Sequence, residues 1–201
     1  PALPLATDPS RLTAPRFIRW QRQLTPAQWT ALKTRAGDEG LTPSTVLLSA
    51  YSETLGNWTR QDGFTLNLTV GDRQILHPEV VGMLGVFTSL IPLAVSSARG
   101  GAFVARARAQ QDELASNLDQ RAFSGVDVQR ALARRAGNPE AGLLPVVFTS
   151  LLGEAGFGAG QYGLRWVDGI TQTPQTWLDN KVYEDEAGGL FIDWDTPAGL
   201  F

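Results

Sequence analysis

The segment FTLNLTV, residues 64–70, alternates strictly between apolar and polar side chains. A period of two residues is typical of a β-strand that packs one face on a core and leaves the other face polar. The chain therefore has to build a sheet with two unlike faces. Gly71 and Asp72 follow directly and end the strand, because both residue types favour turns.

Two helices of the same design are predicted before this strand. Thr25 and Thr42 each stand before a proline, so each offers a hydroxyl N-cap followed by a residue whose missing N–H has no cost at the first helical position. The first helix is predicted to reach about Ala36 and to stop at Gly37. The second carries apolar residues at three- and four-residue spacing over 46–58, a stripe that should lie against the sheet.

The rest of the chain continues to mix strands with helices. Pro92 removes a donor from its strand, which indicates a sheet edge or a bulge, and Ser124 is a candidate N-cap. A hairpin is indicated near the C-terminus, where DEAGG separates two alternating segments. The pattern predicts strands over residues 16–24, 86–95, 144–152, 176–184 and 189–195, helices over residues 101–121 and 125–135, and a flexible glycine-rich loop over residues 153–163. This order predicts a mixed α/β fold.

Composition fits one folded unit of moderate size. The chain has 201 residues, of which 43% are hydrophobic and 18% are charged, with a formal net charge of -3. That is enough apolar material for one sizeable core, and the length lies on the border between one domain and two small ones. The proline-rich residues 1–15 lack periodicity and are predicted to form an arm or linker, and residues 16–201 to form the folded lobe.

Charge and cysteine content argue against several classes of function. Residues 1–100 carry nine basic against seven acidic residues, and residues 101–201 carry eight against thirteen, so neither half has the basic face that nucleic acid requires. The absence of cysteine excludes disulfides and thiolate chemistry and fits a reducing compartment. No run reaches the roughly 18 apolar residues of a membrane span, and no leader opens the chain. We expect a cytoplasmic protein without a membrane contact.

Few single residues indicate chemistry by themselves. His77 has no second ligand at metal spacing, so a structural or exposed role is expected, and the chain contains no GxGxxG, P-loop or GxSxG motif. Thr149 lies in PVVFTSLLG and Asp179 in QTPQTWLDN. Taken singly, Thr149 is expected to be a buried strand hydroxyl bonded to its neighbours, and Asp179 an exposed strand carboxylate.

Taken together, these motifs carry a family resemblance. PVVFTSL at residues 145–151, TQTPQTWLDN at residues 171–180 and the Trp194-Asp195 pair resemble the late motifs of heterocyclization domains of nonribosomal peptide synthetases, a branch of the condensation-domain superfamily. PALPL, LTPSTVLLSAYSETLGNW and FTLNLTVGDR resemble earlier parts of the same family more loosely. The resemblance covers nearly the whole chain, and the QTPQ-x-x-LD run is its most specific part.

The resemblance implies a fold, a reaction and partners. The fold is the α/β lobe related to chloramphenicol acetyltransferase, a mixed β-sheet with helices packed on it. The family's DxxxxDxxS signature lies in an N-terminal lobe, so the chain resembles the C-terminal lobe alone. The reaction condenses a carrier-bound acyl group with a Cys, Ser or Thr thioester and cyclodehydrates the product to a thiazoline or oxazoline. Implied partners are upstream and downstream peptidyl carrier proteins, whose phosphopantetheine carries the substrates, and the N-terminal lobe; no metal or directly bound cofactor is implied.

The resemblance also assigns roles within the site. Asp179 is the implied general acid and base, and Thr149 is its hydroxyl partner. The residues implied to bind substrate or to hold this pair in place are Gln175, Asn180, Ser150 and Trp177, the last of which otherwise serves packing. Asp193 and Asp195 are expected to face water or to cap a turn.

Two departures from the family leave other functions open. Val86 stands where the family has an aspartate, and Asp72 where it has an asparagine. A non-catalytic or degenerate lobe that serves as a structural or docking module is therefore an alternative, and an ordinary amide-forming condensation lobe is another. A stand-alone acetyltransferase has less support, because His77 lacks the expected HxxxDG context. The isolated lobe is expected to be inactive, and its exposed partner face makes self-association plausible.

Overall fold

The computed structural model describes residues 1–12, 15–59, 61, 63–73, 76–96, 100–153, 169–170 and 172–201. Of the predicted glycine-rich loop over residues 153–163, all but Gly153 lies outside the described residues.

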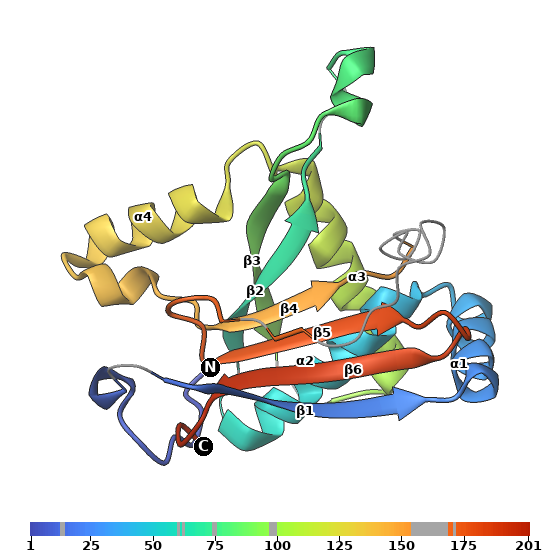
Figure 1. Ribbon diagram of the computed structural model, residues 1–201, viewed down its shortest axis with the longest axis horizontal. Coiled ribbons are helices and arrows are strands. Elements are labelled where there is room, and N and C mark those ends of the chain that lie inside the picture. Colours follow the sequence, from blue (N-terminus) through green and yellow to red (C-terminus); the bar gives the residue numbers. More distant parts are fainter. Residues whose placement is uncertain are drawn as a thin grey trace.

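Six strands of the described chain form one mixed sheet in the order β1-β6-β5-β4-β2-β3. The pairs β1–β6, β5–β6 and β2–β3 are antiparallel, whereas β2–β4 and β4–β5 are parallel. The first and the last strand therefore lie side by side (Figure 1). The strands are β1 Phe17–Leu24, β2 Gly63–Gly71, β3 Thr88–Ser96, β4 Val146–Ser150, β5 Leu178–Glu184 and β6 Leu190–Pro197.

The predicted helices form where their caps indicate. The Thr25 hydroxyl accepts a hydrogen bond from the Gln28 backbone amide, and the Gln28 side-chain oxygen accepts one from the Thr25 backbone amide. The fourth helix is capped in a similar way, since the Ser124 hydroxyl accepts from the Asp127 backbone amide. The first helix includes Gly37 and ends two residues beyond the predicted Ala36. The helices are α1 Pro26–Asp38, α2 Pro43–Thr59, α3 Phe103–Asp119 and α4 Gly125–Ala136, with short 3₁₀ turns η1 Pro9–Arg11, η2 Pro78–Gly82 and η3 Pro139–Gly142.

Pro92 lies in an edge strand of the sheet, which is one of the two positions that its missing N–H predicts. Among the described residues β3 pairs with β2 alone, so it is an edge strand, and Pro92 lies opposite Asn67 without breaking the ladder. A proline is tolerated there because an edge strand has one side without a partner. The strand begins at Thr88, two residues later than the predicted Val86.

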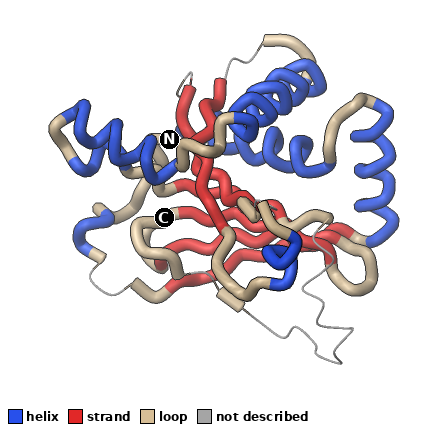
Figure 2. The backbone as a smooth tube through the Cα atoms, turned by 90° about the horizontal axis from the view of Figure 1, so that it is seen from above, coloured by secondary structure: helices blue, strands red, loops and turns tan. Residues whose placement is uncertain are grey.

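One face of the sheet is apolar and packs on helices. Figure 1 and Figure 2 place α1, α2 and α3 on one side of the strands. The core that they enclose uses every second residue of the strands, as the alternation in β2 predicts. It contains Trp29, Leu47, Leu48, Tyr51, Leu55, Leu66, Leu68, Leu93, Val95, Val146, Phe148, Leu178, Val182 and Leu190.

The opposite face of the sheet is polar, and we call it the polar face. Strand register places on it the alternate residues of each strand: Arg19 and Gln21 of β1, Asn67 and Thr69 of β2, Thr149 of β4, Asp179, Lys181 and Tyr183 of β5, and Asp193 and Asp195 of β6.

The N-terminal residues take part in the packing. Leu3 is buried in the main core, and the Ala6 amide donates to the Leu200 carbonyl at 2.8 Å. None of the described helices is long and apolar enough to cross a lipid bilayer.

The connection between β2 and β3 projects away from the sheet (Figure 1). It carries η2 and several exposed apolar side chains, among them Leu84 and Val86. The Arg73 guanidinium lies 3.7 Å from the centre of the Phe87 ring and donates to the Val80 and Met83 carbonyls, so the described part of this segment has internal contacts.

Two glycines give opposite expectations for stability. At Gly125, the first residue of α4, an added Cβ would stand 2.7 Å from the Leu90 carbonyl carbon and still closer to its oxygen. Gly37 is exposed inside α1 and has no atom near that position. We expect Gly125→Ala to lower the free energy of unfolding by about 1–3 kcal/mol through overpacking, and Gly37→Ala to raise it by about 0.5–1 kcal/mol. Urea denaturation measures both, and an unchanged Gly125→Ala would contradict the close approach of α4 to β3.

Candidate functional site on the polar face

Thr149 and Asp179 lie on the same face of neighbouring strands. The parallel register pairs Val147 with Asp179 and Thr149 with Lys181, so Thr149 is two residues along β4 from the neighbour of Asp179. With strands about 4.8 Å apart and a rise of about 3.3 Å per residue, the two Cα atoms are roughly 8 Å apart. The fold thus supplies the proximity that the sequence motifs do not.

The Thr149 hydroxyl is held by a second strand. It donates a 3.0 Å hydrogen bond to the Thr69 hydroxyl of β2, the strand on the far side from Asp179. Thr149 is half-buried, so it keeps a solvent-facing side. The expectation of a strand hydroxyl bonded to its neighbours is met by the bond to Thr69, but the expected full burial is not found. The strand register places Thr149 next to Lys181.

Asp179 is buried, at 5% exposure, which corrects the expectation of an exposed strand carboxylate. It lies directly opposite Asp195 in the antiparallel β5–β6 pair. Side chains in such a pair have Cβ atoms about 4.5–5.5 Å apart, and two like charges there destabilise the sheet unless they are compensated.

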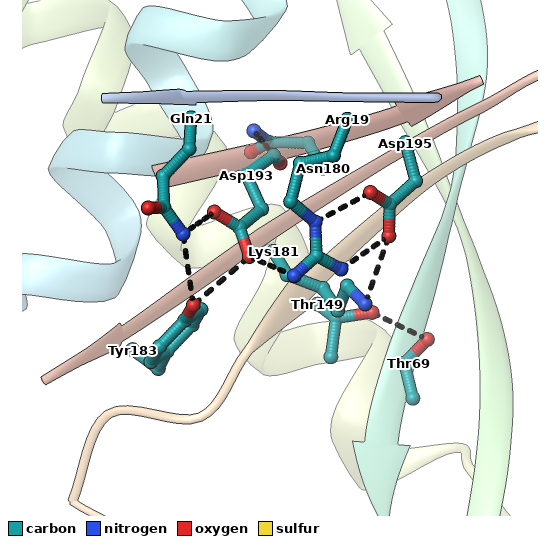
Figure 3. Close-up of polar contacts among 9 residues, drawn as sticks. All are labelled: Arg19, Gln21, Thr69, Thr149, Asn180, Lys181, Tyr183, Asp193 and Asp195. Atoms are coloured by element: carbon teal, nitrogen blue, oxygen red, sulfur yellow. Dashed lines mark hydrogen bonds and ion pairs between the residues drawn. The ribbon is translucent and has the colours of Figure 1, made fainter. Parts of the chain in front are cut away.

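Compensation comes from Arg19 on β1. Its Nε and Nη2 atoms each donate to one oxygen of Asp195 at 2.7 Å, a two-pronged contact, and Nη1 lies 3.0 Å from Asp193 Oδ2 (Figure 3). Lys181 Nζ adds an ion pair to Asp195 at 3.1 Å. Because a paired guanidinium is stabilised in its charged form, the hydrogen bond to Asp195 raises the pKa of Arg19.

Asp193 is held by neutral donors as well as by Arg19. Gln21 Nε2 donates at 2.8 Å and the Tyr183 hydroxyl at 3.0 Å. Burial, followed by the charge of Asp193, raises the pKa of Tyr183 to about 12, so the phenol keeps its proton and remains a donor at neutral pH.

The expectation that Asp193 and Asp195 face water or cap a turn is therefore wrong. Both are fully buried in the middle of β6. A carboxylate is found in such a place only with cations and donors around it, and the sequence contains the signal in parts: Arg19-x-Gln21, Lys181-x-Tyr183 and Asp193-x-Asp195 each repeat a polar residue with the period of a strand.

Ser150 and Asn180 point to the other side of the sheet. The Ser150 hydroxyl bonds the Ser44 hydroxyl of α2 at 2.7 Å. Asn180 is buried at the level of Phe148 and Trp194, and its amide donates to the Asp193 carbonyl at 3.1 Å. The structure thus separates these two residues from Thr149 and Asp179, and it gives each a contact within the fold.

Gln175 and Trp177 lie just before β5. Thr173 to Thr176 form a turn closed by a 3.2 Å hydrogen bond, with Pro174 second and Gln175 third. Gln175 is exposed and has φ of 63°. This is the left-handed conformation that glycine normally adopts at the third position of a type II turn. Trp177 is half-buried, and its carbonyl accepts from Thr196 at 2.8 Å.

The two residues that depart from the family, Val86 and Asp72, lie on the connection between β2 and β3. Val86 is exposed at 91% on the β2–β3 connection. Asp72 Oδ1 lies 3.2 Å from Arg121 Nε of the segment after α3. His77 is exposed and its Nδ1 accepts from the Glu79 amide at the start of η2, which confirms its structural or exposed role. In the described ranges no three His, Cys, Asp or Glu side chains are grouped to hold a metal ion.

Known proteins resemble the chain along its entire length. Residues 1–152 match the model of the condensation domain family. Pyochelin synthetase PchF of Pseudomonas aeruginosa is 45% identical over 205 residues, covering 100% of this chain and 11% of that protein. Phenyloxazoline synthase MbtB of Mycolicibacterium paratuberculosis is 36% identical, over 100% of this chain and 17% of that protein. The chain thus spans less than a fifth of these relatives.

Solved structures agree with the sequence relatives. The cyclization-docking bidomain of EpoB, a nonribosomal peptide synthetase from Sorangium cellulosum, superposes with a TM-score of 0.85 at 38% identity, over 99% of this chain and 40% of that one. The first condensation domain of the CDA synthetase superposes with a TM-score of 0.69 at 18% identity, which supports the fold alone. The fold implied by the resemblance is confirmed, and the chain belongs to the condensation-domain family.

Proposed function

We propose that the chain is the C-terminal lobe of a heterocyclization domain and that its polar face is one wall of the active site. The observation that carries the proposal is the placement of Thr149 and Asp179 on one face of neighbouring strands, in a fold similar to the EpoB cyclization domain. The N-terminal lobe and two carrier proteins are the proposed partners, with substrates arriving as thioesters on phosphopantetheine.

The proposed chemistry needs one group that both takes and gives a proton. The side-chain thiol or hydroxyl of the acceptor residue attacks the amide carbonyl carbon, so a sulfur–carbon or oxygen–carbon bond forms and the attacking group loses its proton. The resulting hydroxyl then leaves as water after gaining a proton, and the ring nitrogen loses one. A carboxylate in the position of Asp179 can perform these transfers, a role worth about 10²–10⁴ in rate. The Thr149 hydroxyl orients that carboxylate or binds the reacting oxygen.

Substitutions on the polar face test the assignment in the complete domain, with acceptor and donor loaded on carrier proteins and products followed by intact mass. We expect Asp179→Asn to slow ring closure by about 10²–10⁴-fold and Thr149→Ala by roughly tenfold through one lost hydrogen bond. Both variants should accumulate the linear amide, one water heavier than the ring product.

Two matched variants serve as controls. Ser150→Ala removes the neighbouring hydroxyl on the opposite face, and Glu186→Gln makes the same carboxylate-to-amide change in the exposed turn between β5 and β6. Both should close the ring at the wild-type rate. Equal losses in Thr149→Ala and Ser150→Ala would mean that the face carries no site.

The non-catalytic alternative rests on Val86 and is decided by the same assay. If the wild-type domain stops at the linear amide, the lobe is a condensing or structural module. In that case Val86→Asp, which restores the family's carboxylate on the exposed β2–β3 connection, asks whether that one departure removed ring closure.

Gln175 offers a separate test of substrate contact. A residue other than glycine in the left-handed conformation is strained by about 1–2 kcal/mol. Gln175→Gly removes this strain, but glycine also has more conformational entropy in the unfolded chain. The free energy of unfolding should therefore rise by up to about 1 kcal/mol. Gln175→Ala keeps the strain and loses the amide. If the amide binds substrate, both variants lose ring closure while only the glycine variant gains stability in urea denaturation. Wild-type ring closure in both would remove Gln175 from the site.

The two-lobe interpretation predicts that the 201-residue chain alone gives little or no ring product, because half of the active-site wall and of the carrier contacts belongs to the other lobe. Turnover by the chain alone at the rate of the complete domain would overturn that interpretation. Intact-mass measurement on the same loaded carriers makes the comparison direct.

A further inference from the structure

Four charged side chains stand beside Asp179 and balance one another. Arg19 and Lys181 carry two positive charges, and Asp193 and Asp195 two negative ones. All four are nearly enclosed, with both carboxylates fully buried (Figure 3). Buried charges act over longer distances than exposed ones because solvent screens them less.

We propose that this network positions the charge of Asp179: Lys181 favours its carboxylate form and Asp195 its protonated form, so that the two together set the pH at which it exchanges a proton. The inference deepens the proposed function, on which it rests for the catalytic role of Asp179. Asp195 and Lys181 act through Asp179 and are positioning residues; they do not themselves exchange the proton.

The strand register places both proposed positioning residues, Asp195 and Lys181, next to Asp179. Asp195 is the cross-strand neighbour of Asp179, and Lys181 is the next residue of β5 on the same face, about 6.6 Å along the strand. Arg19 ties up both oxygens of Asp195 at 2.7 Å. Asp179 therefore lies beside one acidic and one basic side chain, which are held in place by their ion pairs.

Other elements add little charge on this side. β4 and β2 contribute uncharged Thr149, Thr69 and Asn67. From α2, the hydroxyl of Tyr51 is buried without a hydrogen-bond partner among the described residues, and burial followed by the charge of Asp179 raises the pKa of Tyr51 well above its usual value. The charged and titratable groups near Asp179 in the described chain are Arg19, Lys181, Tyr183, Asp193 and Asp195 on the polar face, and Tyr51 on the helix-covered side of the sheet.

The signs of two substitutions differ, which a purely structural role does not predict. Lys181→Gln leaves a net charge of −1 beside Asp179, so the carboxyl should hold its proton to higher pH. Asp195→Asn leaves +1 and keeps an acceptor for Arg19, so the carboxyl should lose its proton at lower pH. Each shift should be roughly one to three pH units, the effect expected when one charge within about 4–6 Å is removed.

The experiment measures the shift in two ways on the complete domain. The acid limb of the pH–rate profile for ring closure should move up for Lys181→Gln and down for Asp195→Asn. In parallel, carbon-13 NMR of aspartate carboxyls, with the Asp179 signal assigned by its loss in Asp179→Asn, follows the proton directly and needs no turnover. Lys181→Arg keeps the charge and should restore the wild-type limb.

Arg22→Gln is the matched control, since Arg22 lies on β1 with Arg19 but is exposed and on the other face of the sheet. It should leave both readouts unchanged. Shifts of Asp179 in the same direction for both network variants, or no shift, would overturn the proposal. If the NMR titration moves with the expected signs while ring closure ignores Asp179→Asn, the network assignment stands and the proposed catalytic function fails. Should Asp195→Asn not fold, Lys181→Gln against Lys181→Arg still decides the outcome.

Discussion

The register of β5 between β4 and β6 is fixed by its apolar residues. Leu178 and Val182 are nearly completely buried in the helix-covered core. Because side chains alternate along a strand, Asp179 and Lys181 must lie on the opposite face. A slip of one residue would turn both charges into the core and both apolar side chains out. The packing that stabilises the sheet is therefore also what orients the proposed catalytic and positioning groups, and the two cannot be varied separately.

Burying Asp193 and Asp195 costs free energy, and the stability of the fold alone does not require that they be buried. Removing a carboxylate from water costs several kcal/mol, and the contacts of Arg19, Gln21 and Tyr183 offset this without making a better core than apolar side chains would. Well-packed apolar replacements of buried ion pairs are often as stable or more so. A balanced set of charges at this place is explained more readily by the electrostatic needs of the proposed site around Asp179 than by the fold.

What the sequence predicts depends on how far apart the interacting residues are. Thr25 and Ser124 indicate helix starts because each caps its helix by a hydrogen bond to a residue three positions further on. Pro92 indicates an edge strand because its own backbone N–H is missing. Local patterns also delimit every strand to within about two residues. The burial of Asp195 depends instead on Arg19, 176 residues away, and nothing near Asp195 in the chain reveals that partner. The proximity of Thr149 to Asp179 is equally nonlocal, so the motifs named the pair while only the sheet brought it together.

The pairing of β1 with β6 has a consequence for the order of events during synthesis. Arg19 leaves the ribosome long before its partner, and at about 5–20 residues per second the separation of 176 residues along the chain takes roughly 10–35 s to synthesise. For that interval β1 has an open edge and an unpaired guanidinium, while β2 and β3 can already form their hairpin. The polar face is thus completed last, and a nascent chain stalled before Leu190 would lack β6 and with it Asp193 and Asp195 of that face.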